Sequence, residues 1–328
     1  MARVLSGIQP TGGIHLGNYL GAIRQWAADQ HTEDSYFLVV DLHALTVPRD
    51  PADLRAKTLE TTLLLVAAGL DPDVCTLFIQ SHVHEHAELC WILESVAGMG
   101  ELERMTQFKE KARDGAESAR VALFAYPVLQ AADILLYDAD RVPVGDDQRQ
   151  HLELCRDLAL RFNHRYGDTF VVPEAATPKL GARVMDLQNP TAKMSKSTDS
   201  PQGTVLVLDD PATIERKFKR AVTDAGTDVE FDPATKPGVS NLLQIFAAAT
   251  GRRPAQLADG YSQYGPLKAD TAEAVIELLR PVRERYAELA ADPEAVRATL
   301  AQGAEKAGAV AAGTLARAQA AVGLLPRG

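Results

Sequence analysis

The first third of the chain alternates between short apolar runs and longer amphipathic stretches. Residues 4–5, 35–41 and 76–80 are apolar runs that predict buried strands, because a strand covered on both faces of a parallel sheet has a continuous hydrophobic run. A proline opens a predicted helix over residues 51–68, and Gly69 ends it. The order strand, helix, strand, helix, strand predicts half of a doubly wound, Rossmann-like parallel sheet in an α/β protein.

The middle of the chain changes to a mainly helical pattern. Residues 99–173 predict a helical insertion between the halves of the sheet, with short breaks at Gly115, Pro127 and Gly145. The sequence of strands in the predicted sheet is therefore expected to be interrupted there.

Strand character returns at residues 184–185 and 204–208, on either side of a polar loop. Beyond this loop only helices are expected, over residues 212–222, 240–250, 267–291 with a kink at Pro281, and 294–322. We predict a Rossmann-like domain over residues 1–208, including the insertion, and an all-helical C-terminal domain over residues 209–328.

Composition is that of an ordinary globular protein, with 46% hydrophobic and 24% charged residues. The longest apolar stretch, near residues 63–68, is much shorter than the roughly 20 residues of a membrane span. The chain enters its first strand directly after Met1-Ala2-Arg3, which leaves no room for a signal peptide, so we expect a cytoplasmic protein. Three widely spaced cysteines without a C-x-x-C pair predict buried thiols rather than disulfides or a metal site.

The net charge of −10 argues against broad, non-specific binding of nucleic acid, which depends on neutralising phosphates. A nucleic-acid partner would need a local basic face. Residues 216–220 and 280–285 are the two candidate clusters, although either could be a solvated helix face.

The turn after the first strand, from Ser6 to Gly21, is rich in glycine and leads into a helix expected over residues 20–28. The first turn of a helix leaves backbone N–H groups without partners and attracts phosphate, and glycines let a nucleotide approach the backbone closely. The pattern matches neither of the two common phosphate loops. It adds His15 and Asn18, one turn apart, which can both donate hydrogen bonds to a negative group. By itself, the turn could also be an ordinary glycine-rich turn.

A second polar segment carries two cations. Residues 193–197 spell Lys-Met-Ser-Lys-Ser and are flanked by Pro190 and Pro201, which predicts a loop. A loop with two lysines is suited to hold a polyphosphate.

Three alternate histidines, His82, His84 and His86, could share one metal ion. No second cluster of ligands matches them, so a metal site is the less favoured interpretation.

Residues 15–18 (His-Leu-Gly-Asn) resemble the His-Ile-Gly-His signature of class I aminoacyl-tRNA synthetases, with Asn in the last place. Residues 193–197 match the second signature of that class letter for letter. Other segments narrow the resemblance to the tryptophanyl-tRNA synthetases of the bacterial type, from residue 3 to about residue 325. These segments are residues 7–12, 101–111, 131–135 and 142–148.

The resemblance implies a two-step reaction. The carboxylate of L-tryptophan would attack the α-phosphate of ATP and release pyrophosphate, and the tryptophanyl group would then pass to the 3′ end of tRNA(Trp). It also implies that residues 1–208 are the catalytic domain and that residues 209–328 are a helical anticodon-binding domain. It further implies a symmetric homodimer, and Mg²⁺ carried on the phosphates of ATP rather than in a protein metal site.

The resemblance assigns roles residue by residue. His15, Lys193 and Lys196 are the expected catalytic residues, because a displacement at phosphorus depends on positioning and charge stabilisation. The expected ATP-binding residues are Gln9, Pro10, Thr11, Gly17, Asn18, Gly145, Asp146, Asp147, Val184, Lys193, Met194, Ser195, Lys196 and Ser197.

Selection of tryptophan requires an acceptor for the indole N–H, the one polar atom of the ring. Asp133 lies among apolar residues of a predicted helix, where a carboxylate must have a partner. Phenylalanine would leave it unpaired, although Asp133 could instead pair with an arginine. Tyr126 and Gln148 are candidates for the α-ammonium group of the substrate, with Gln107 and His43 as weaker ones.

Two positions depart from the family pattern: many members have Met where Gln130 stands, and some have Phe where Leu5 stands. Both positions could alter inhibitor sensitivity or the shape of the pocket. The rival functions are a tyrosine-specific relative, a nucleotidylyltransferase with a related histidine loop, and a duplicated synthetase that acts as a binding or regulatory protein.

Overall fold

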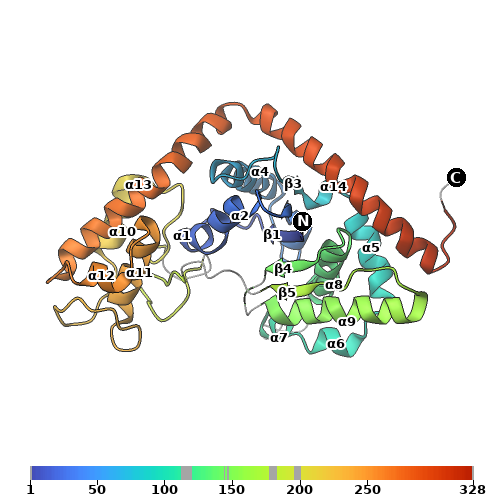
Figure 1. Cartoon of the computed structure of the whole chain (residues 1–328), viewed down its shortest axis with the longest axis horizontal. Helices are drawn as coiled ribbons and strands as arrows, with labels where there is room; N and C mark the ends of the chain where they lie inside the picture. Colours follow the sequence, from blue (N-terminus) through green and yellow to red (C-terminus); the bar gives the residue numbers. More distant parts are fainter. Residues whose placement is uncertain are drawn as a thin grey trace.

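The computed structural model describes residues 2–111, 120–143, 145, 148–176, 183–195 and 201–326. Within them, parallel strands form one sheet in the order β3-β2-β1-β4-β5 (Figure 1). The strands are β1 (Arg3–Ile8), β2 (Asp34–Val39), β3 (Thr76–Ile79), β4 (Arg141–Pro143) and β5 (Glu174–Ala176). The predicted doubly wound parallel sheet is confirmed.

β1 lies where the strand order reverses, between β2 and β4. The register places Ile8 opposite Val39, and Val39 opposite Ile79, so three strands end at the same edge of the sheet. Ligands of open α/β sheets bind outside this edge, at the point of reversal. The segments that follow β1 and β2 are therefore placed to form a site.

Helices cover both faces of the sheet (Figure 1). Tyr36 and Leu38 of β2 belong to one hydrophobic core, and Phe37 and Val39 belong to the other, as the two-residue period of a strand requires. The helices of this half are α1 (Leu16–Asn18), the π-helical turn η1 (Tyr19–Ile23), α2 (Arg24–Asp29), α3 (Asp41–Ala44), α4 (Pro51–Ala67), the 3-10 turn η2 (Gln80–His82), α5 (Glu85–Glu94), α6 (Met99–Glu103), α7 (Thr106–Lys111), α8 (Val121–Leu135) and α9 (Arg149–Tyr166).

Three local predictions were wrong. Residues 184–185 and 204–208 form isolated antiparallel bridges, not strands of the sheet. β4 and β5 extend the sheet instead, and β4 lies inside the expected helical insertion; strands of three residues are too short to show a period. Pro127 lies inside α8 and does not break it, because packing against α5 and α9 outweighs the lost backbone hydrogen bond.

The C-terminal part is helical, as predicted. Its helices are α10 (Pro211–Lys219), α11 (Pro237–Thr250), α12 (Pro254–Ala258), α13 (Tyr264–Ala291) and α14 (Pro293–Ala321). α10 begins at Asp210, whose side chain accepts from the N–H of Thr213, and α11 ends at Gly251 in the left-handed conformation. Pro281 lies inside α13 without ending it.

The last helix connects the two halves of the molecule. α13 packs against α10 and α11, whereas α14 runs back over β3 and α5 (Figure 1). The closest approach is at Gly303, where a Cβ atom would lie 1.9 Å from the carbonyl oxygen of Leu77 in β3. The domain boundary between residues 208 and 209 stays a prediction. α14 lies after this boundary in the sequence but packs on β3 and α5, which lie before it.

Candidate active site

The first signature segment lies between β1 and α1. His15 is buried and is the N-cap of α1. Its ring Nδ1 accepts the backbone N–H of Asn18 at 3.2 Å, and the backbone N–H of His15 donates to Oδ1 of Asn18 at 3.4 Å. Because Nδ1 accepts, the neutral ring carries its hydrogen on Nε2, and this N–H is the group that can donate to a phosphate oxygen.

Gly17 is required by the position of this imidazole. A Cβ atom at Gly17 would lie 3.0 Å from both Nδ1 and Cε1 of His15, and 3.6 Å from Cβ of Met194. Gly17 thus makes room for the imidazole of the first signature, whereas its distance to Met194 would be an ordinary van der Waals contact.

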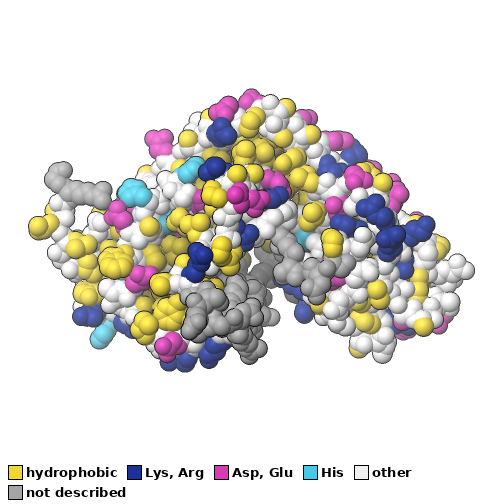
Figure 2. Space-filling model, turned by 180° about the vertical axis from the view of Figure 1, so that it is seen from behind, with side chains coloured by type: hydrophobic (Ala, Val, Ile, Leu, Met, Phe, Trp, Pro, Cys, Tyr) yellow, Lys and Arg dark blue, Asp and Glu magenta, His cyan; other side chains and the backbone are white. Residues whose placement is uncertain are grey.

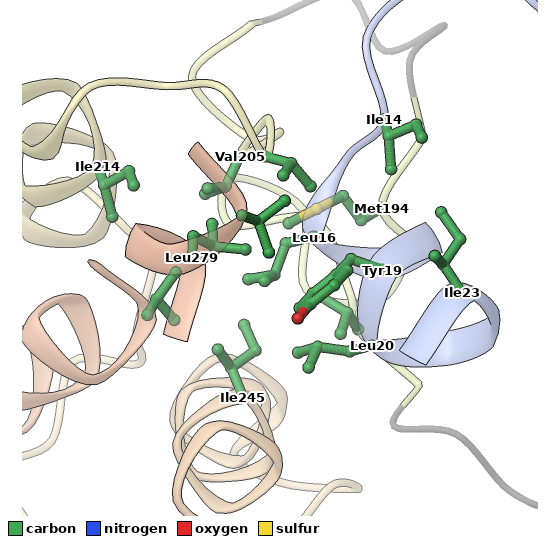
Figure 3. Packing of buried hydrophobic residues seen from close by; sticks show 14 of the residues in the cluster. Ile14, Leu16, Tyr19, Leu20, Ile23, Met194, Val205, Ile214, Ile245 and Leu279 are labelled. Carbon is green, nitrogen blue, oxygen red and sulfur yellow. The ribbon is translucent and has the colours of Figure 1, made fainter. Parts of the chain in front are cut away.

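The second signature segment is held by its methionine. Met194 is 1% exposed, and its side chain packs among Leu16, Tyr19 and Val205 (Figure 3). Its N–H donates to the carbonyl oxygen of Val184 at 3.0 Å. Lys193, just before it, is exposed.

Residues 204–207 join the two signatures. They pair with the first signature segment through the N–H of Leu16 to the carbonyl of Val205 (2.8 Å) and the N–H of Val207 to the carbonyl of Ile14 (2.9 Å). At the other end, Oγ1 of Thr204 donates to the carbonyl of Ser195 at 2.8 Å. Two segments that are far apart in the sequence are therefore adjacent in space.

A cavity of about 440 Å³ opens beside the sheet between β1, β2, α8 and β4. Its wall includes six of the residues predicted to bind ATP or tryptophan, together with both family departures, Leu5 and Gln130. The six are Gln9, His43, Tyr126, Asp133, Gly145 and Gln148. Another predicted ATP-binding residue, Thr11, lines a second cavity of about 290 Å³ with Gly12 and Gly13.

Asp133 is 3% exposed and accepts hydrogen bonds on both oxygens. Oδ1 accepts from Nε2 of Gln80 (2.7 Å) and from Nδ1 of His86 (2.6 Å), and Oδ2 accepts from Nε2 of His43 (2.7 Å). Burial by itself raises the pKa of Asp133, but the charge and hydrogen bonds of His43 and His86 lower it well below its ordinary value of 3.8. The partners are thus histidines and a glutamine, and the arginine pairing considered above was wrong.

The three alternate histidines do not share a metal ion. His86 points inward to Asp133, and its Nε2 contacts the hydroxyl of Tyr137 at 2.8 Å, whereas His82 and His84 are exposed. Sequence reasoning missed Gln80 and His86 as partners of Asp133. The signal was their position after the end of β3, at the edge of the sheet where ligands collect.

Tyr126 and Gln148 are linked by His151, which the sequence did not single out. Nδ1 of His151 lies 2.9 Å from Oε1 of Gln148, and Nε2 lies 2.8 Å from the hydroxyl of Tyr126. Because Oε1 can only accept, Nδ1 donates, and Nε2 of the neutral ring accepts the hydroxyl hydrogen. Burial raises the pKa of Tyr126 to about 12, so this hydroxyl stays protonated at neutral pH.

For the remaining predicted site residues, the structure gives the burial of the side chain or no description. Pro10 and Val184 are buried, and Asn18 is half-buried. Lys196, Ser197, Asp146, Asp147 and the side chain of Gln107 lie outside the described residues. The individual roles in binding and catalysis stay predictions.

In the described part of the chain, no group of three His, Cys, Asp or Glu side chains has an arrangement that could hold a metal ion. None of its helices combines the length and the apolar character that a membrane span requires. Its three cysteines are free thiols.

Comparison with known proteins assigns a family to this geometry. The sequence model of the family "tRNA synthetases class I (W and Y)" matches residues 1–280. Tryptophan–tRNA ligase 1 of Streptomyces coelicolor is 58% identical, covering 99% of this chain and 98% of the relative. Tryptophan–tRNA ligase of Caldanaerobacter subterraneus is 52% identical, covering 100% of each chain.

Solved structures agree with these relatives. Tryptophanyl-tRNA synthetase from Mycoplasma pneumoniae superposes with a TM-score of 0.90 at 35% identity, covering 99% of this chain and 98% of that one. Tryptophanyl-tRNA synthetase from Campylobacter jejuni, complexed with ADP and tryptophan, has a TM-score of 0.84 at 33% identity, covering 98% and 100%. The chain therefore belongs to the class I tRNA synthetases of the tryptophan and tyrosine group.

Proposed function

We infer that this chain is a tryptophan–tRNA ligase, which activates L-tryptophan with ATP and transfers the tryptophanyl group to the 3′ end of tRNA(Trp). The observation that carries the substrate assignment is the ionised, buried Asp133 in the wall of the 440 Å³ cavity. Relatives that match over almost their whole length and are named tryptophan–tRNA ligases support the same substrate. Since tRNA is used in translation, we also place the enzyme in the cytoplasm.

The first signature supplies a donor to the phosphates. His15 is buried, its orientation is set by the cap on α1, and Nε2 carries the hydrogen. A donor fixed in advance stabilises charge that develops on a phosphate oxygen without reorganising during the reaction. Lys193 and Lys196 hold the departing pyrophosphate, and the hydroxyls of Ser195 and Ser197 assist them.

Mg²⁺ enters on the phosphates of ATP. This cation prefers to keep several water ligands and to bind through substrate phosphates. Among the described residues, no group of three His, Cys, Asp or Glu side chains has an arrangement that could hold a metal ion.

The cavity fits an amino acid with an indole ring. Its volume of about 440 Å³ is within the usual range of small-molecule sites. Oδ2 of Asp133 accepts one hydrogen bond, from His43, and a carboxylate oxygen can accept a second from the indole N–H. The oxygen of Tyr126, whose hydrogen is directed to His151, and the amide oxygen of Gln148 accept hydrogen bonds from the α-ammonium group.

The tRNA contacts a basic face on α10. Arg216, Lys219 and Arg220 are exposed there, and Figure 2 shows Lys and Arg side chains gathered on the side of the molecule that holds the C-terminal helices. Lys217 of the same cluster is 7% exposed and does not belong to this face.

The enzyme works as a homodimer that buries exposed apolar side chains of the sheet half. Large hydrophobic side chains are exposed on four helices of that half, namely Trp91 (75%) on α5, Met99 (67%) on α6, Val121 (81%) on α8 and Leu160 (53%) on α9. Exposed apolar surface of this kind favours association. Light scattering should give twice the mass of one chain, and a monomer at all working concentrations would refute this assembly.

The decisive experiment is the exchange of labelled pyrophosphate into ATP, measured with each proteinogenic amino acid. We expect exchange with tryptophan and not with tyrosine or phenylalanine. Exchange with tyrosine alone would overturn the substrate assignment. Charging of tRNA(Trp) in the same preparation separates an enzyme from a paralogue that only binds.

A further inference from the structure

A buried lysine joins the two signature segments. Lys217 of α10 is 7% exposed, and its ammonium donates to the carbonyl of Thr204 at 2.7 Å and to Oδ2 of Asp209 at 2.6 Å. The side chains of this ion pair are 8% and 14% exposed. Because an ammonium in this environment has lost its water, both acceptors hold it firmly in place.

Each acceptor of Lys217 leads to a different signature. Thr204 donates through Oγ1 to the carbonyl of Ser195 in the second signature, at 2.8 Å. Oδ2 of Asp209 also accepts the N–H of Leu206, at 2.8 Å, and Leu206 forms an antiparallel bridge with His15. A single ammonium therefore sits where the connections to both signatures meet.

We propose that Lys217 is a positioning residue for adenylate formation, which holds residues 204–207 in the register that sets His15 and the Lys193–Ser195 segment around ATP. It acts through Thr204 and Asp209. This proposal rests on the ligase function inferred above. Transfer at phosphorus depends mainly on the placement of the charged groups. A shift of residues 204–207 should therefore reduce turnover rather than amino-acid binding.

Geometry separates this effect from tryptophan binding. Lys217 and Thr204 line the 290 Å³ cavity beside Gly12 and Gly13, whereas the residues proposed to contact tryptophan line the 440 Å³ cavity. A change at Lys217 should therefore leave the tryptophan pocket intact.

Two variants test the proposal by pyrophosphate exchange. Lys217→Met should lower kcat about 100-fold, the scale of a misplaced reacting group, and Thr204→Val, which removes the hydroxyl bond to the carbonyl of Ser195, should lower it about tenfold. In both variants, KM for tryptophan should stay within about twofold of the wild-type value, because the contacts that bind tryptophan in the ground state are unchanged. Lys306→Met in α14 is the matched control and should behave as wild type, because Lys306 is exposed and its ammonium donates to the carbonyl of Pro72, away from both signature segments.

The outcomes are distinguishable. Wild-type protein that fails to exchange with tryptophan refutes the proposed function itself. If wild type exchanges, unchanged kcat in the variants overturns the role of Lys217, and so does a rise in KM for tryptophan that matches the loss of kcat. If Lys217→Met does not fold, Thr204→Val decides by the same two numbers.

Discussion

Asp133→Asn is the substitution that most directly tests how the proposed site selects tryptophan. It keeps the shape of the side chain but removes the charge and one acceptor oxygen. The carbonyl oxygen of the new amide can still accept from Gln80 and His86, which places its NH₂ group where Oδ2 now accepts from His43. An NH₂ group there faces the indole N–H with a donor instead of an acceptor.

The expected loss follows from the buried position of this group. Leaving a buried donor unpaired costs about 3 kcal/mol, which corresponds to roughly a 100-fold loss in kcat/KM for tryptophan. Phenylalanine has no ring N–H and should lose little. The ratio of tryptophan to phenylalanine activation should therefore fall by roughly the same factor.

The same change lowers stability at neutral pH. Three hydrogen bonds to a charged group become at most neutral ones, while the cost of burying a charge disappears, so we expect a net loss of about 2–4 kcal/mol in the free energy of unfolding. Wild type gains stability from ionised Asp133 above its ordinary pKa of 3.8. This contribution should be lost as the pH falls below that value toward the lowered pKa of the folded state, and Asp133→Asn should remove this part of the acid dependence.

The assays are pyrophosphate exchange with both amino acids and urea unfolding at several pH values. Asp138→Asn is the matched control, because Asp138 pairs with Arg317 at the surface and should contribute within about 1 kcal/mol. Unchanged discrimination between tryptophan and phenylalanine in Asp133→Asn would refute the acceptor role. Unchanged stability would refute the account of the buried network.

Two other predictions concern Tyr126 and α14. Tyr126→Phe removes an oxygen proposed to contact the α-ammonium group, so KM for tryptophan should rise about tenfold in the exchange assay while KM for ATP is unchanged; an unchanged KM for tryptophan would contradict this contact. Gly303→Ala should destabilise the protein by about 1–3 kcal/mol, because its Cβ would lie 1.9 Å from the carbonyl oxygen of Leu77. Gly308→Ala on the same helix meets no atom within 4 Å and should stabilise by up to about 1 kcal/mol, so equal effects of the two in urea unfolding would argue against the close packing of α14 on β3.

Several features could be predicted from the sequence because their signals are local. The apolar runs of β1, β2 and β3 predicted the parallel sheet, since strands covered on both faces need continuous hydrophobic residues. Caps and stops such as Asp210 and Gly251 act through neighbouring backbone groups, so the helix ends they mark were predicted to within a few residues. The two signature segments, residues 15–18 and 193–197, were recognised from the identity and order of their residues.

Tertiary structure alone decided which side chains meet. Nothing near Asp133 in the sequence indicates that His43, Gln80 and His86 would converge on it, because their approach depends on parallel strands that end at one edge of the sheet. Likewise, Lys217 has the sequence context of a surface cation, and only the packing of α10 buries it. Periodicity records which face of an element is apolar, but a buried polar group is defined by partners that distant segments bring to it.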